Sequence, residues 1–167
     1  MISSAMMSEF ILRNGTEADG PAVLEMYRSA IGAQGSVWDE NYPTELEIAG
    51  DLAAGTLYVF EKAGTLAGAV SVVPENELDE LDCWRETESC CEIARVVISP
   101  EFRGKGLSSV MVGMLADRLK AEGIRSIHLL VARDNLIARR TYASLGFEFY
   151  EDCFMFGHYH TAAEKLF

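Results

Sequence analysis

The stretch Cys91-Glu-Ile-Ala-Arg-Val-Val-Ile-Ser-Pro-Glu-Phe-Arg-Gly-Lys-Gly-Leu-Ser-Ser109 decides the fold. Residues 92–98 are rich in β-branched side chains and predict a strand, which Ser99 and Pro100 end. A glycine-bearing turn follows at 103–106, and the apolar residues after it recur at helical spacing. The first amides of a helix have no partner within the helix and lie at the positive end of its dipole. This order of strand, glycine turn and helix start therefore predicts a site for a phosphate group.

Two common glycine-containing motifs, the phosphate-binding loop of nucleotide-triphosphate-binding proteins and the nucleophile elbow of serine hydrolases, do not fit this turn. A nucleotide-triphosphate loop needs Gly-x4-Gly-Lys followed by Ser or Thr, but Ser99 stands where the first glycine is required and Gly106 follows Lys105. A serine-hydrolase elbow needs Gly-x-Ser-x-Gly, and Val110 occupies its last position. The turn therefore supports neither of these chemistries.

The turn is similar to the Arg/Gln-x-x-Gly-x-Gly/Ala motif of the GNAT superfamily of N-acetyltransferases, which also follows a strand that ends in a hydrophobic triplet. In that family the amides of the turn hold the pyrophosphate of acetyl-CoA. The resemblance assigns this role to Arg103, Gly104, Lys105, Gly106, Leu107 and Ser108. Ser108 replaces the usual Gly or Ala, which crowds the backbone there, although its hydroxyl could donate to a phosphate oxygen.

The rest of the chain extends the resemblance. Hydrophobic periodicity and capping residues predict strands at 9–13, 56–61, 65–73, 92–98, 126–132, 147–156 and 158–166, and helices at 20–31, 45–55, 107–123 and 134–145. The order β-α-α-β-β-β-α-β-α-β-β is the order of the GNAT fold. The resemblance implies an α/β (α+β) fold whose mixed, mostly antiparallel central sheet has one parallel strand pair splayed around CoA. We expect a flexible tail at 1–8, a single domain at 9–167, and an exposed, mobile acidic loop at 75–89.

The last predicted helix contains a second group of residues, Asn135, Ala138 and Tyr142, with Asp134 as its expected cap. Their spacing places all three on one helix face over roughly 10 Å. With Gly146-Phe147 they are similar to the GNAT pattern, which implies that they contact the pantetheine arm of CoA and that the tyrosine hydroxyl lies near the thioester sulfur. A phenol with a pKa of about 10 can protonate a departing thiolate, so Tyr142 is the expected general acid.

The strand before the glycine turn is expected to supply the base and the oxyanion donor. An acceptor amine must be neutral to attack, and Glu92 is the candidate base, since some GNAT branches use a glutamate at this position. Val96, Val97 and Ile98 resemble the triplet whose backbone pairs with pantetheine, where an amide could polarise the thioester carbonyl.

Two further groups leave alternatives open. Cys90 and Cys91 adjoin Glu92, so an acyl-enzyme route through a thiol is conceivable, but no histidine is near them in sequence and at most one can face the site. A loop between the first two helices could shape the acceptor pocket, or its tryptophan could simply anchor the loop on the core. Its candidate acceptor residues are Trp38, Asp39, Glu40 and Tyr42.

Composition narrows the possible partners. The 167 residues have a net charge of -12, which disfavours nucleic acid. Residues 95–140 hold nine Lys/Arg and four Asp/Glu, whereas the remainder holds five and twenty-two, so one part suits an anion and the other a cation. No apolar run is long enough for a membrane span, and the four cysteines and three histidines show no metal spacing. We expect a cytoplasmic monomer or homodimer with free thiols and no metal.

The sequence therefore predicts an N-acetyltransferase that moves an acetyl group from acetyl-CoA to the primary amine of a small molecule or peptide, by direct attack in a ternary complex. Transfer of a longer acyl group, or a catalytically silent acyl-CoA sensor, are the alternatives.

Overall fold

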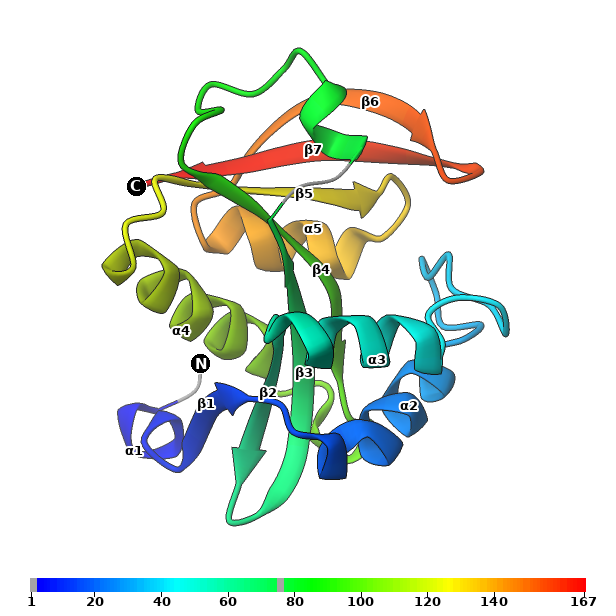
Figure 1. The fold of residues 1–167 in the computed structure, drawn as a ribbon, viewed down its shortest axis with the longest axis vertical. Helices are drawn as coiled ribbons and strands as arrows, with labels where there is room; N and C mark the ends of the chain where they lie inside the picture. Colours follow the sequence, from blue (N-terminus) through cyan, green and yellow to red (C-terminus); the bar gives the residue numbers. More distant parts are fainter. Residues whose placement is uncertain (1–2, 75–76) are drawn as a thin grey trace.

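A seven-stranded sheet organises the molecule (Figure 1). The computed structural model describes residues 3–74 and 77–167. The strands are β1 (Phe10–Asn14), β2 (Leu57–Lys62), β3 (Thr65–Val73), β4 (Cys90–Ile98), β5 (Ser126–Ala132), β6 (Glu148–Met155) and β7 (His158–Leu166), in the spatial order β1-β2-β3-β4-β5-β7-β6. All neighbours are antiparallel except β4 and β5. The predicted order of strands and helices and the single parallel pair are both confirmed.

Four helices lie where the sequence predicts them, with ends shifted by at most two residues. The helices are α1 (Ser4–Met7), which the sequence analysis did not predict, α2 (Gly20–Ser29), α3 (Glu45–Ala54), α4 (Leu107–Ala121) and α5 (Leu136–Ser144). Thr44 and Glu47 form the capping box that starts α3. The expectation that Asp134 caps the last helix is wrong: Asn135 is the cap, and its Oδ1 accepts from the Ala138 amide at 3.1 Å. Asn135 therefore begins the helix instead of lying within it.

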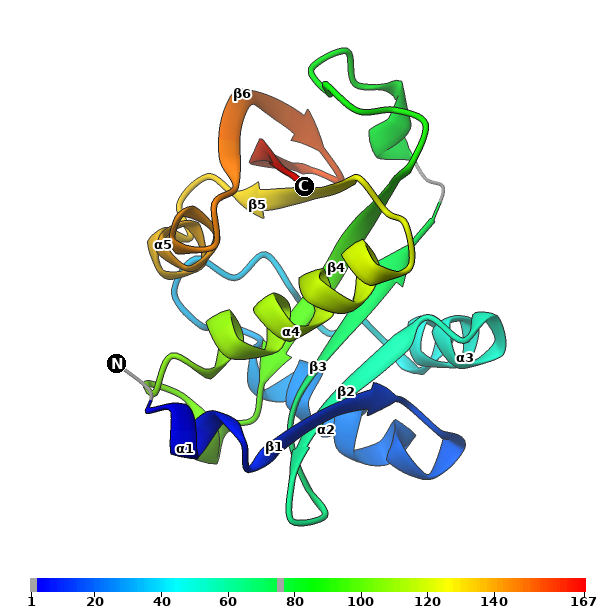
Figure 2. The ribbon, with the colours of Figure 1, turned by 90° about the vertical axis from the view of Figure 1, so that its left-hand side faces the viewer.

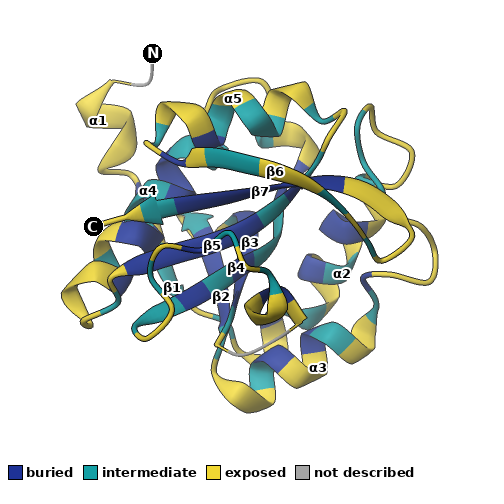
Figure 3. Ribbon diagram, turned by 90° about the horizontal axis from the view of Figure 1, so that it is seen from above, coloured by how far each residue is buried: buried dark blue, intermediate teal, exposed yellow. Residues whose placement is uncertain are grey.

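Helices cover both faces of the sheet (Figure 2). Because side chains alternate along a strand, Tyr58 and Phe60 pack toward α4 and α5, whereas Leu57 and Val59 pack toward α2 and α3. Figure 3 shows the buried strands between helices whose outer surfaces are exposed. In the part of the chain that the structure describes, no helix has the length and apolar character needed to cross a membrane.

The parallel pair β4 and β5 separates soon after it forms. The two strands pair only over Cys90–Glu92 and Ser126–His128. Beyond these residues β5 crosses the molecule while β4 continues along its length (Figure 1). The amides of a separated strand edge are available to another backbone or a ligand, which is the arrangement that the resemblance implied around CoA.

The acidic connector at 75–89 is not simply an exposed loop. Residues 75–76 lie outside the described part, but Glu77–Glu80 form a 3₁₀ turn, and Leu78 and Trp84 are buried against β7. Two connector amides, those of Arg85 and Glu86, donate to the carboxylate of Glu164 at 3.1 Å. The prediction of an exposed loop is thus wrong for Leu78 and Trp84, and a buried carboxylate 78 residues or more away in sequence binds the connector backbone. The mobility of this segment stays a prediction.

Glu164 also binds three side chains of the sheet. Its carboxylate, fully buried in β7, accepts from Ser126 Oγ at 2.8 Å, His128 Nε2 at 3.1 Å and Tyr150 Oη at 2.6 Å. Burial alone would raise the pKa of the carboxyl, but the hydrogen bonds from its donors, with Tyr150 the largest, lower that pKa to about 2. The connector, β5, β6 and β7 therefore meet at one ionised group.

We predict that Glu164→Gln loses about 3 kcal/mol of unfolding free energy at pH 7, since an amide nitrogen would then face only donors. The folded-state pKa lies below the ordinary 4.5, so the contribution of Glu164 is present above pH 4.5 and is lost as the pH falls toward 2. Urea unfolding at several pH values measures both effects. Glu148→Gln is the matched control, because Glu148 faces Glu164 in the ladder but is exposed. Equal stability of the two variants at pH 7 would contradict the prediction.

Candidate active site

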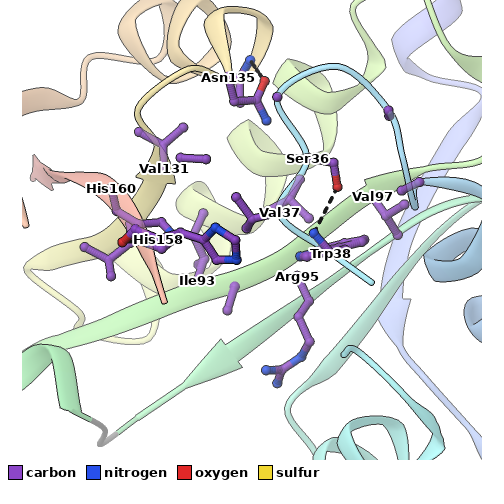
Figure 4. Close-up of a pocket in the computed structure, with 18 of the residues that line it drawn as sticks. Ser36, Val37, Trp38, Ile93, Arg95, Val97, Val131, Asn135, His158 and His160 are labelled. Atoms are coloured by element: carbon purple, nitrogen blue, oxygen red, sulfur yellow. Dashed lines mark hydrogen bonds between the residues drawn. The ribbon is translucent and has the colours of Figure 1, made fainter. Parts of the chain in front are cut away.

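A cavity of about 750 Å³ occupies the opening between β4 and β5 (Figure 4). Its walls come from both strands, the start of α4, α5, the loop after α2 and the turn between β6 and β7. The cofactor residues expected from the sequence that line it are Val96, Val97, Ile98, Arg103, Ser108, Asn135, Ala138 and Tyr142. Residues 104–106 lie on the exposed turn between two lining residues, and Leu107 is buried in the core. The structure therefore brings the two predicted motifs together at one cavity.

The glycine turn has the geometry that its sequence requires. Gly104 and Gly106 adopt φ values of 74° and 73°, the left-handed region that glycine enters without strain. Gly106 is also the N-cap residue of the 15-residue helix α4, whose first amides lie at this turn. The Arg103 side chain folds back, with Nε donating to the Ile98 carbonyl at 2.9 Å and an Nη to Ser29 Oγ at 2.8 Å. Arg103 thus fixes the turn to β4 and α2.

Tyr142 of α5 is one of the residues that line the cavity. It is 8% exposed, and its ring packs edge-on against Phe147 with centroids 5.5 Å apart. Burial raises the pKa of its phenol above the ordinary value of 10. The hydroxyl therefore stays protonated at neutral pH and is available as a proton donor.

Glu92 of β4 lies at the same cavity, beside His128 in the short parallel ladder. Burial raises the pKa of its carboxyl from the ordinary 4.5 to about 7, and the charges of Asp79 and Glu77 add to this increase, while Arg95 opposes it. A carboxylate that titrates near neutral pH can accept a proton from an ammonium group.

The two neighbouring cysteines do not favour a covalent route. Neither Cys90 nor Cys91 is among the described residues that line the cavity. Burial raises the pKa of both thiols, that of Cys91 to about 12. Since the thiolate is the nucleophile, these environments disfavour an acyl-enzyme.

The loop after α2 forms a wall of the cavity. Trp38, Asp39 and Tyr42 line it, whereas Glu40 is exposed and is not among the lining residues. The loop touches α5 directly, because a Cβ placed on Gly35 would lie only 2.7 Å from Asn135 Cα. Trp38 packs edge-on against Tyr27 of α2, with ring centroids 5.4 Å apart. Its role as a loop anchor and its position in the cavity wall are therefore compatible.

Several lining residues were not predicted. The cavity also contains Arg95, Leu130, Val131, Ala132, Ile137, Thr141, Phe156, His158 and His160. The strand 126–132 was predicted as the parallel partner of β4, and that signal could have identified its last residues. The histidines reach the cavity from the end of the chain, and no local pattern indicates this placement.

A group of three possible metal ligands lies near Glu92. The ligand atoms of Asp79, Cys90 and His128 are within 4.8 Å of one another. The Nε2 atom of His128 already donates to Glu164. The absence of metal stays a prediction.

The comparisons with known proteins agree with this geometry. The model of the acetyltransferase (GNAT) family matches residues 22–147. A mycothiol acetyltransferase of Actinosynnema mirum is 38% identical over 63 residues, which cover 38% of this chain and 21% of the relative. An acetyltransferase of Pectobacterium atrosepticum is 35% identical over 60 residues, which cover 36% of this chain and 42% of the relative. The chain thus spans less than half the length of these curated relatives.

Solved structures show the same fold at low sequence identity. A GNAT-family acetyltransferase from Streptococcus agalactiae has a TM-score of 0.79 at 20% identity, covering 94% of this chain and 95% of its own. A putative acetyltransferase from Salmonella typhimurium, solved with its cofactor acetyl-CoA, has a TM-score of 0.72 at 20% identity, covering 94% and 93%. Since the family model spans most of the chain and the fold agrees, the chain belongs to the GNAT acetyltransferase family.

Proposed function

We propose that the chain transfers an acetyl group from acetyl-CoA to the primary amine of a small molecule or peptide, by direct attack in a ternary complex. The observation that carries the proposal is the cavity between β4 and β5, which both Glu92 and Tyr142 line and which reaches the glycine turn of α4 at Arg103 and Ser108. Family membership supports the same reaction.

The residues around the cavity fit the chemical parts of CoA. The helix start and the two left-handed glycines suit a pyrophosphate, because backbone amides can approach an anion closely there. The β4 edge at Val96, Val97 and Ile98, which β5 leaves unpaired, suits the amide groups of a pantetheine arm. When bound, acetyl-CoA supplies an activated acetyl thioester. Asn135, at the start of α5, lines the same cavity.

Two side chains suit the proton transfers of the reaction. Formation of the amide C–N bond and cleavage of the C–S bond require a proton to leave the amine and another to reach the thiolate. Glu92, with its pKa near 7, accepts the first, and the protonated phenol of Tyr142 donates the second. The acidic lining residues Asp39 and Glu77 favour an ammonium-bearing acceptor.

Thiol release from acetyl-CoA tests the proposal directly. Purified protein is incubated with acetyl-CoA and a panel of small amines, polyamines, amino acids and peptides, with longer acyl-CoA esters in parallel. Release above the amine-free rate with one amine class supports the proposal, and mass spectrometry identifies the acetylated nitrogen. CoA binding without any turnover would favour the sensor, and preference for a longer ester would replace the acetyl donor.

Glu92→Gln should lower kcat/KM about 100-fold at pH 8, since general-base catalysis typically contributes that much or more. In the unaltered enzyme kcat/KM should rise as the pH increases through about 7, where Glu92 ionises. The variant should lack this dependence.

The same variant makes an independent prediction about stability. Because the folded-state pKa of Glu92 lies above the ordinary 4.5, the folded protein holds a proton that the unfolded chain has released, so stability falls as the pH rises from 4.5 through 7. Glu92→Gln should remove that fall, and thermal unfolding at pH 5 and pH 8 measures it. Glu88→Gln, at a largely exposed position, is the control. In the activity measurement described above, a Glu92→Gln variant that kept the wild-type pH profile of kcat/KM would exclude Glu92 as the base.

A further inference from the structure

Arg95 interrupts β4 with a backbone conformation that is unusual for its residue type. Its φ is 52°, in the left-handed region, where a Cβ is strained. The pairing of β3 with β4 shifts at this point, because Ala69 faces Val97 but Ser71 faces Ala94. One extra residue on β4 therefore makes a β-bulge. Such strain persists only where the surroundings compensate for it.

The bulge changes which side chains face which layer. Before it, Cys91 and Ile93 pack in the core beneath α4, and regular alternation would send Arg95 into the same apolar layer. After it, Val96 and Ile98 pack on that layer, and Val97 packs toward α2 and α3. The extra residue thus keeps a charge out of the apolar core and sets the orientation of the triplet that lines the cavity.

The Arg95 guanidinium instead reaches a buried carboxylate on α3. An Nη of Arg95 lies 2.9 Å from both carboxylate oxygens of Asp51, and both side chains are 11% exposed. Ser71 of β3 also donates to Asp51. In Figure 4 the Arg95 side chain points away from Asn135 and Val131, toward α3. The ion pair therefore ties the bulge to α3.

A second link joins Arg95 to the loop that lines the cavity. Its other Nη donates to Tyr42 Oη at 3.1 Å. Tyr42 and Trp38 belong to that loop, and both line the cavity. Arg95 therefore links α3 and the loop that lines the cavity.

We infer that Arg95 is a positioning residue of the proposed reaction, which holds the cofactor strand through Asp51 and the acceptor loop through Tyr42. The inference rests on the proposed function, because it assigns the Asp51 link to the binding of acetyl-CoA and the Tyr42 link to the binding of the acceptor amine. A single side chain then couples the geometry of the CoA-binding edge of β4 to that of the loop across the cavity.

Variants at positions 95 and 42 separate the two links from each other and from the bulge. Glycine adopts φ values near 52° without strain, so Arg95→Gly keeps the bulge accessible and removes both side-chain links, whereas Arg95→Ala also disfavours the bulge. Each is made together with Asp51→Asn, so that no unpaired charge stays buried. Tyr42→Phe removes only the link to the loop.

Calorimetry with CoA and acrylamide quenching of tryptophan fluorescence report on the two sites without turnover. We expect both double variants to raise the Kd of CoA at least tenfold, because each removes the link to Asp51, and Tyr42→Phe to stay within about threefold of wild type. All three should increase quenching, because Trp38 lies in the released loop whereas Trp84 is buried.

Thermal unfolding identifies any variant whose fold is lost, and Tyr42→Phe, which removes one hydroxyl, keeps the loop link testable in that case. A Kd near wild type in the Gly double variant would show that the bulge and not the Arg95 side chain positions the strand. That result, or unchanged quenching in Tyr42→Phe, would overturn the inference. Wild-type protein that does not bind CoA would instead refute the proposed function.

Discussion

Replacement of Gly106 by glutamate is expected to weaken CoA binding at least about 100-fold, or about 2.7 kcal/mol. Gly106 caps α4 with φ 73° and ψ 17°, and it belongs to the turn proposed to hold the pyrophosphate. A glutamate there would strain the backbone and obstruct the approach of the phosphates. Its negative charge would also occupy the positive end of the helix dipole in place of the phosphates and would repel them. Isothermal titration with CoA measures the change.

Gly55→Glu is the matched control for the strain of this substitution. Gly55 has a similar left-handed conformation, with φ 69° and ψ 26°, at the end of α3, and a Cβ there would meet no atom within 4 Å. It does not line the cavity. We expect wild-type affinity in this variant. If Gly106→Glu also bound CoA within threefold of wild type, the pyrophosphate site would lie elsewhere.

Removal of the Tyr142 hydroxyl is the second prediction with a large effect. Tyr142→Phe should lower kcat about 100-fold, the usual lower range for loss of a general acid, and should leave the Kd of CoA within about threefold. The phenyl ring keeps its packing against Phe147, so the fold should be unaffected. Single-turnover thiol release with the acceptor found by the amine screen separates chemistry from binding.

Tyr58→Phe controls for the loss of a hydroxyl from a buried tyrosine. Tyr58 is 7% exposed, close to the 8% of Tyr142, but it lies on β2 beneath Arg118 and outside the cavity lining. Its kcat should equal that of wild type. Unchanged thiol release in Tyr142→Phe would show that another group, or water, protonates the thiolate.

Local patterns were sufficient for most of the fold. The Gly106 turn followed by an apolar helical repeat, the Thr44 capping box and the mainly apolar run in 126–132 each indicate one element without knowledge of its neighbours. The strand-helix-strand order also predicts that β4 and β5 are parallel, because a crossover helix joins them. These signals are local, since they depend on residues within a few positions of one another.

Interactions between residues that are far apart in the sequence could not be predicted from these local patterns. Glu164 binds the amide of Arg85, 79 residues earlier, and nothing in the acidic connector indicates that its backbone is held by a buried carboxylate. Likewise His158 and His160 reach the cavity only because β7 is inserted between β5 and β6. Such placements depend on strand order, which is decided by the packing of the whole sheet.

The sequence by itself determined the order of strands and helices and the glycine turn at the start of α4, because each rests on residue type and spacing. Its resemblance to the GNAT family indicated Tyr142 and Glu92 as the candidate acid and base. Only the tertiary structure decided how these residues face the cavity. One extra residue at Arg95 reverses the alternation of β4, and it does so because Asp51, 44 positions away, pairs with a charge that the apolar core would exclude. A strand pattern read locally cannot include that partner, so the orientation of Val96, Val97 and Ile98 is a property of the folded molecule.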